Sequence, residues 1–347
     1  MSENLFEQVI STENLFSAWD QFKKGKRGKE DVMRFEHDVE VHLFKLHSEL
    51  KSKTYRHGGY SGFFIYDPKL RHVHKANVRD RVLHHAVFTV LNRVFEPTFI
   101  PTSFSCRIGK GTHKGFEWVE NALCKESRNY TKACYALKCD VKKFFDTVDH
   151  HILLSILSKR VRDPHLVWLL REIIDSYESE RSNLFSAKGV PIGNLTSQIF
   201  ANIYMGEFDQ FMKQTLRVNR YARYTDDFIV ISTDRAYLES LIEPMKEFLK
   251  KKLALELHPD KVTIRRVTQG IDFLGYVSLP HYRLMRRRTK RRIVWKLKGR
   301  IREFKSGLIS REVLDQSFKS YLGVLSHADA HDFSERLKNQ YWLWVNQ

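Results

Sequence analysis

The sequence of 347 residues is poor in the features that would cross-link it or anchor it in a membrane. It has only four cysteines, Cys106, Cys124, Cys134 and Cys139, and none of them has the spacing of a zinc or C-x-x-C redox site. We therefore expect free, buried thiols in a reducing compartment. The sequence has no apolar run of about 18 residues and no secretory signal. These absences predict a cytoplasmic protein with no membrane partner.

Negative charge is also scarce, because 41 Asp and Glu stand against 59 Lys and Arg, a net charge of +18. Lys and Arg in such excess gain free energy by releasing counterions from phosphates, so we expect a polyanionic partner. A basic surface that serves only solubility is the alternative. Apolar residues make up 42% of the chain, which is enough for a substantial core.

Hydrophobic periodicity predicts helices mixed with short strands. Residues 1 to about 56, and those from 285 onward, are expected to be helical, and 236–253 to form one helix. Residues 135–140 are predicted as a buried strand that ends in a carboxylate. The segments "RYARY" and "FIVIS" predict a tight hairpin, and 271–279 a strand pair or bend. The sequence therefore predicts an α+β centre with helical ends.

Three acidic residues occupy the ends of these predicted strands. Asp226 and Asp227 lie between the strands of the hairpin, and Asp140 ends an apolar strand. Adjacent carboxylates, and a charge beside apolar residues, are costly unless a cation compensates them. An Asp-Asp pair alone is more typical of a solvated turn, because Asp is a common turn residue. Together the three predict a site for two Mg²⁺ ions, with Mn²⁺ as a substitute, one activating a 3′-hydroxyl and one stabilising a leaving pyrophosphate.

The segments around these residues resemble the reverse transcriptase family over nearly the whole chain. "DVKKFFD" is similar to the family's first catalytic motif, "YTDD" to its Y-x-D-D box, and "GVPIGNLTSQIFANIY" to a motif of group II intron-like enzymes. The resemblance implies a right-hand polymerase fold with fingers, a palm of antiparallel sheet plus helices, and a helical thumb. The expected divisions are an N-terminal helical extension (1–60), fingers (61–134), a palm (135–284, with a fingers-proximal segment at 180–196) and a basic thumb (285–347).

The same resemblance implies roles at the catalytic centre. Asp140 and Asp226 are expected to bind the metal ions, with Asp227 in support and the backbone carbonyl of Val141 completing a metal shell. Lys261, in "HPDKVTI", corresponds to a lysine proposed to protonate the leaving pyrophosphate, and an ordinary surface lysine is the alternative.

Further positions are expected to bind the nucleotide. Phe145 matches an aromatic steric gate that excludes a 2′-hydroxyl and so selects dNTPs, and a core aromatic is the alternative. Lys69 and Arg71, in "DPKLR", match residues that grip the triphosphate. Ile192, Gly193 and Gln198 are also expected to bind the nucleotide, and the family's residue at the position of Ile192 lies beside the nascent base pair. Ile192 departs from the family, which has Gln there, and loss of that polar contact predicts reduced fidelity.

Nucleic-acid contacts are expected at three places. Two arginines in "VRDRVLHH" are expected on template phosphates, unless Asp80 pairs with them in a structural cluster. The segment "GIDFLGY" resembles the primer grip, and the basic thumb is expected to track a duplex. A solvated face or a membrane-surface helix is the alternative for the thumb. The residues concerned are Arg79, Arg81, Phe273, Leu274, Gly275, Arg286, Arg287 and Arg288.

The resemblance also bears on the biological role. "RDRVLHHA", "SCRIGKGTH", "PIGNLTSQ" and "SYLGVLSHADAHDF" are similar to reverse transcriptases of diversity-generating retroelements. Those enzymes copy a dedicated RNA into cDNA with errors at adenine and work with a small basic accessory protein. A bacterial defence reverse transcriptase that copies a structured non-coding RNA is the alternative. An endonuclease or RNase H segment is not evident after 285, which disfavours an intron mobility enzyme. A non-catalytic RNA-binding protein with the same fold is a further alternative.

Overall fold

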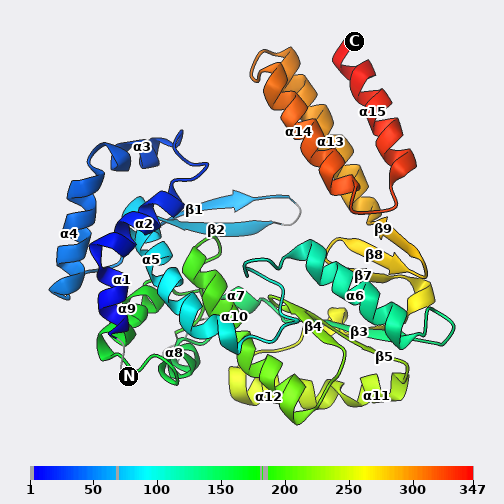
Figure 1. The fold of residues 1–347 in the computed structure, drawn as a ribbon, viewed down its shortest axis with the longest axis horizontal. Helices are drawn as coiled ribbons and strands as arrows, with labels where there is room; N and C mark the ends of the chain where they lie inside the picture. The colour runs from blue at the N-terminus through cyan, green and yellow to red at the C-terminus, as the bar shows by residue number, and fades with distance from the viewer. Residues whose placement is uncertain (1–3, 68–69, 180–181, 183–186, 347) are drawn as a thin grey trace.

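The computed structural model describes residues 4–67, 70–179, 182 and 187–346. Within them the chain forms helices and three antiparallel sheets, so the expected α+β class is confirmed. Figure 1 shows a group of N-terminal helices with a projecting hairpin, a central sheet flanked by helices, and a group of C-terminal helices that stands apart. The expectation of helical ends around a mixed centre is confirmed by this arrangement.

The central sheet has four antiparallel strands in the order β4-β5-β3-β6. Its elements and the helices on its faces are β3 (Tyr135–Asp140), β4 (Tyr221–Tyr224), β5 (Asp227–Ser232), β6 (Thr263–Arg266), α6 (Thr112–Glu126), α10 (Leu195–Gln210) and α12 (Ile242–Leu253). Alternate residues of a strand point to opposite faces. One face buries Leu137 and Phe228 in the core shared with α10 and α12, and the other packs Ala136 and Ile229 against α6. The predicted strand and hairpin are confirmed.

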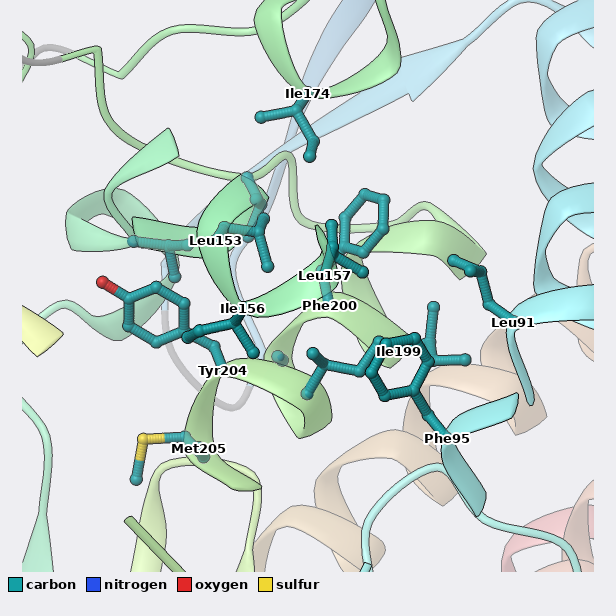
Figure 2. Close-up of a cluster of buried hydrophobic side chains, with 14 of the residues drawn as sticks. Leu91, Phe95, Leu153, Ile156, Leu157, Ile174, Ile199, Phe200, Tyr204 and Met205 are labelled. Carbon is teal, nitrogen blue, oxygen red and sulfur yellow. The ribbon is translucent and has the colours of Figure 1, made fainter. Parts of the chain in front are cut away.

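The largest core cluster joins the N-terminal helices to α10. It is built on α5 (Val78–Phe95), α8 (His150–Ser158), α9 (Pro164–Asp175) and α10. Figure 2 shows Leu91 and Phe95 of α5 beside Ile199 of α10, with Leu153 and Leu157 of α8 nearby. Because α10 is buried along most of its length, it connects this core rigidly to the sheet.

The N-terminal region consists of short helices and the projecting hairpin. Their bounds are α1 (Leu5–Ile10), α2 (Thr12–Phe22), α3 (Glu30–His37), α4 (Val39–Lys51), β1 (Tyr60–Ile65) and β2 (Arg71–Ala76). Ser11 begins α2, since its hydroxyl accepts from the Asn14 amide at 3.2 Å. Most of β1 is exposed, and β2 is buried only at Val73 and Ala76. The hairpin therefore projects from the body of the protein, as Figure 1 shows.

The C-terminal region begins with a small sheet and continues into helices. Its elements are β7 (Ile271–Phe273), β8 (Tyr276–Leu279), β9 (Tyr282–Met285), α13 (Arg287–Lys305), α14 (Arg311–Leu325) and α15 (His331–Asn346). Leu274 and Gly275 have positive φ of 47° and 97°, as a two-residue turn requires. Helix α13 buries Ile293, Leu297 and Ile301 on one stripe and leaves its basic residues outside.

One predicted helix is wrong in its extent. Residues 236–253 form parts of two helices, α11 (Arg235–Ser240) and α12, separated at Leu241. Pro244 explains the break, because proline lacks an amide donor and is tolerated only in the first turn of a helix. It lies in the first turn of α12.

The cysteines are only partly as expected. All four are free, but only Cys134 and Cys139 are buried, where burial raises their pKa to about 11 and about 12. Cys106 is exposed and Cys124 is half-buried, so the expectation of buried thiols is wrong for these two. No helix among the described residues is long and apolar enough to cross a membrane.

Candidate active site

The three predicted carboxylates meet at one end of the central sheet. Asp140, the last residue of β3, lies directly opposite Asp227, the first residue of β5. Asp226 lies in the turn between β4 and β5, and its carbonyl accepts from the Val141 amide at 3.3 Å. The fold therefore brings together residues that are distant in the sequence.

This arrangement is electrostatically unfavourable by itself. Like charges directly opposite one another on a sheet repel. Burial, together with the charges of Asp227 and Asp140, raises the pKa of Asp226 to about 6. Burial also raises the pKa of Asp227, with Asp140 adding to the effect. A bound cation would relieve this repulsion, so the cluster of carboxylates favours cation binding.

Lys261 joins the cluster from a short 3₁₀ turn, Pro259–Lys261. Its ammonium lies 2.7 Å from Asp140 Oδ1, and the His258 amide donates to the Asp140 carbonyl at 2.8 Å. The lysine is therefore not an unrelated surface residue.

The residues present fit a divalent metal by their chemistry. Among the described residues, no three His, Cys, Asp or Glu side chains already form a set of metal ligands, and Asp140 is instead held by Lys261. Carboxylate oxygens and the nearby backbone of Val141 are nevertheless the hard donors that Mg²⁺ prefers. Binding requires Asp140 to exchange the ammonium for a cation.

Two of the expected nucleotide-binding residues, Ile192 and Gly193, contact strand β2 of the hairpin. The Ile192 carbonyl accepts from the His74 amide at 3.1 Å. Gly193 has φ of 113°, and a Cβ there would lie 2.7 Å from a methyl group of Val73, so the chain needs glycine to approach β2. Ile192 is half-buried, and Gln198 is exposed on α10.

Arg71 and Phe145 complete the expected set as far as the structure describes it. Arg71 is exposed at the start of β2, and Lys69 lies outside the described residues. Phe145 lies on α7 (Phe144–Thr147), half-buried against the main core with its ring 5.4 Å from that of Phe144. Its carbonyl accepts from the Val190 amide at 2.8 Å. The core-aromatic alternative describes these contacts, and a role as steric gate stays a proposal.

The comparison with known proteins identifies the family. Residues 66–278 match the family described as reverse transcriptase (RNA-dependent DNA polymerase), which is more than half of the chain. The chain belongs to the reverse transcriptase family.

Two curated relatives are similar to this reverse transcriptase over part of their length. Protein YkfC of Escherichia coli (strain K12) is 27% identical over 258 residues, 64% of this chain and 65% of the relative. The group II intron-encoded protein LtrA of Lactococcus lactis subsp. cremoris is 22% identical over 271 residues, 60% of this chain and 44% of the relative. The chain thus spans less than two thirds of either relative. A solved telomerase from Candida albicans in complex with a telomeric RNA fragment is 11% identical, with a TM-score of 0.49 over 85% of this chain and 61% of that one, too distant to inform function.

The first pair of expected template-binding arginines in this reverse transcriptase is engaged in ion pairs. Arg79 contacts Glu49 at 2.8 Å and Asp80 at 3.2 Å, and Arg81 contacts Asp31 at 2.6 Å. Asp80 is fully buried. The structural-cluster alternative therefore describes Arg79, whereas Arg81 pairs with Asp31 instead of Asp80. Template binding by these arginines stays a proposal.

The segment that resembles the primer grip is ordered by its neighbours. Phe273 is fully buried and Leu274 is half-buried. The Gly275 carbonyl accepts from the Arg286 amide at 3.3 Å, and the Arg286 guanidinium pairs with Asp272. Helix α13 therefore starts from the same turn that the family resemblance assigns to the primer.

Basic residues in the first half of α13 lie near the projecting hairpin. Arg287 and Arg288 are exposed. Lys296 lies 2.5 Å and Arg292 3.9 Å from the carboxylate of Asp67, which follows β1. These contacts lower the pKa of Asp67, chiefly through the hydrogen bond from Lys296. An acidic side chain thus occupies part of a helix face that suits phosphates.

The sequence analysis missed the polar residues behind the turn that carries Asp226. They form a buried network around Arg223 and Asp209, both fully buried. Arginine in a strand is ordinarily exposed, so neither periodicity nor composition could indicate this pair. The only available signal was the position of Arg223 directly before the Y-x-D-D box.

Proposed function

We propose that this protein is an RNA-directed DNA polymerase that copies a dedicated RNA template into cDNA. The observation that carries the proposal is the placement of Asp140 opposite Asp227 with Asp226 in the adjoining turn. Membership of the reverse transcriptase family supports the same chemistry. The net charge of +18 suits an RNA template and a cDNA product.

The proposal assigns parts to the regions of the chain. Residues 1–60 form the N-terminal extension, 61–134 the fingers, 135–284 the palm with its segment at 180–196, and 285–347 the thumb. Two hydrogen bonds to His74 of β2, from its amide to the Ile192 carbonyl and from the Asn194 side chain to its carbonyl, support grouping that segment with the fingers. The basic outer residues of α13 support its assignment as a duplex-tracking thumb.

The residues at the carboxylate cluster then have definite tasks. Asp140, Asp226 and Asp227, with the Val141 carbonyl, would hold two divalent cations, Mg²⁺ or in its place Mn²⁺. When bound, these cations supply charge compensation for the attacking 3′-hydroxyl and the leaving pyrophosphate. Lys261, already at hydrogen-bonding distance from Asp140, would transfer a proton to the leaving group. Arg71 and Lys69 would bind the triphosphate of the dNTP.

Primer extension tests this proposal. The wild-type protein should extend a DNA primer on an RNA template with dNTPs and Mg²⁺, and Asp226→Ala should bind the primer–template but not extend it. Glu256→Ala is the matched control, because Glu256 is an exposed carboxylate whose near neighbour Leu257 pairs with Val141. Extension by Asp226→Ala would show that the site is wrong. Binding without extension by the wild-type protein would favour a non-catalytic RNA-binding protein.

For the biological role we propose a diversity-generating retroelement, with error-prone synthesis and a small basic accessory protein. The motif resemblance of four segments supports it, together with Ile192 at the position that is Gln in group II intron enzymes. Antiphage defence with a structured non-coding RNA is the second candidate. Sequencing the nucleic acid that co-purifies with the protein separates them. cDNA with errors at template adenine supports the first, and faithful cDNA of a non-coding RNA supports the second.

A further inference from the structure

A buried ion pair lies beneath the turn that carries Asp226. Arg223 on β4 and Asp209 on α10 are both fully buried. The guanidinium donates to both carboxylate oxygens of Asp209, at 2.8 Å and 2.7 Å. The Tyr221 hydroxyl donates to the same carboxylate at 2.7 Å. The charge of Asp209 is therefore fully matched, which a buried carboxylate needs.

The same guanidinium reaches the turn itself. Arg223 donates to the carbonyl of Thr225 at 2.9 Å and to Asn202 Oδ1 at 3.3 Å. It also donates to the Ser103 hydroxyl at 3.1 Å. Only the planar fork of arginine provides enough donors for this set of partners. Arg223 thus connects helix α10 to the backbone immediately before Asp226.

Thr225 explains why the turn needs such support. Its φ is 56°, in the left-handed region that a β-branched residue rarely adopts. A strained residue of this kind persists only where its surroundings fix it. Besides the bond from Arg223, its hydroxyl lies 2.6 Å from that of Ser105. Asn202 in turn donates to the Ser105 carbonyl at 2.8 Å, so both attachments lead back to α10.

We propose that Arg223, held by Asp209, is a positioning residue that fixes the strained turn at Thr225 and thereby aims Asp226 and Asp227 at Asp140. Arg223 lies behind the turn and is fully buried, so it does not itself touch a substrate. Loss of its hydrogen bonds would let Thr225 relax to a favourable φ, and the two carboxylates would turn away from Asp140. The inference rests on the proposed function, because it assumes that these carboxylates bind metal ions.

The test compares Arg223→Lys with the double variant Arg223→Lys/Thr225→Gly. Lysine keeps the charge beside Asp209 but cannot make the remaining bonds. Mn²⁺ binding, followed by the EPR signal of the free ion, and single-nucleotide extension are measured on each full-length protein. We expect Arg223→Lys to lower Mn²⁺ affinity and kcat at least tenfold, with the KM for primer–template unchanged. Glycine adopts positive φ freely, so Thr225→Gly should restore much of the loss.

Two further variants separate the positioning effect from a general loss of stability. Tyr204→Phe is the control for lost stability, because Tyr204 is fully buried on α10 and its hydroxyl donates to the Leu253 carbonyl. It should unfold more easily than the wild type without changing Mn²⁺ affinity. Ser105→Ala removes the other attachment of Thr225 without unpairing a buried charge, and it replaces Arg223→Lys if that variant does not fold. It should show the same losses to a smaller extent.

The outcomes are distinguishable. The positioning role would be overturned if Arg223→Lys had the same Mn²⁺ affinity and kcat as Tyr204→Phe. It would also be overturned if adding Thr225→Gly to Arg223→Lys did not restore the Mn²⁺ affinity and kcat. A wild-type protein that binds Mn²⁺ but does not extend primers would overturn the proposed function alone, since Mn²⁺ binding still tests Arg223. A wild-type protein that binds no Mn²⁺ would overturn both.

Discussion

The carboxylate of Asp226 should destabilise the metal-free protein. Its pKa is raised from 3.8 to about 6, first by burial and then by the charges of Asp227 and Asp140. A shift of about two units corresponds to about 3 kcal/mol. Because the folded-state pKa is the higher one, ionisation opposes folding. The penalty is absent below the unfolded pKa, grows between pH 4 and 6, and is fully present above pH 6.

Asp226→Asn removes this charge at nearly constant shape. In the presence of EDTA at pH 8, the variant should be more stable than the wild type by up to about 3 kcal/mol, measured by urea unfolding. At pH 4 the two should be equally stable. Glu256→Gln, an exposed carboxylate near the site, should show no such pH dependence. A variant that is less stable than the wild type at both pH values would contradict an electrostatic penalty at Asp226. Added Mg²⁺ should stabilise the wild type more than the variant.

Three other outcomes are expected from the site and its surroundings. Ile192→Gln should lower the error rate opposite template adenine in a fidelity assay, and unchanged errors would contradict the role of Ile192. Phe145→Ala should raise incorporation of NTPs relative to dNTPs at least tenfold in single-turnover extension, whereas equal discrimination would leave Phe145 as a core residue. Asp67→Asn should strengthen duplex binding a few-fold at low salt and leave it unchanged at high salt. In the variant, Lys296 and Arg292 no longer have to give up their ion pairs with Asp67 before they bind a phosphate. Equal affinities at low salt would contradict that exchange.

Local patterns in the sequence were enough to predict the elements that carry the carboxylates. The apolar run before Asp140 and the two short strands around Asp226 and Asp227 each predicted their strand correctly. Antiparallel pairing then placed Asp140 opposite Asp227, but the register depends on long-range contacts that no local pattern contains. The break at Leu241 was missed because helical periodicity continues across it and outweighed Pro244.

Contacts that depend on tertiary structure were beyond the sequence. The sequence indicated Asp80 as an alternative partner of Arg79. The ion pair of Arg79 with Glu49 was not indicated, because it joins elements that are far apart in the chain. The ion pair of Arg223 with Asp209 is of the same kind, since only the packing of α10 against β4 buries both charges. Such groups give no periodic signal, because a buried charge is recognised by its partner and not by its position in a strand.

Affinity cleavage can locate a divalent cation between the ends of β3 and β5. Fe²⁺ in place of Mg²⁺, with ascorbate and peroxide, produces hydroxyl radicals that cleave the nearby backbone. We expect cuts close to Asp140–Val141 and to Thr225–Asp227, suppressed by excess Mg²⁺ and lost in Asp226→Asn. Cleavage at neither segment, or cleavage that persists unchanged in the variant, would contradict a metal site between these two strands.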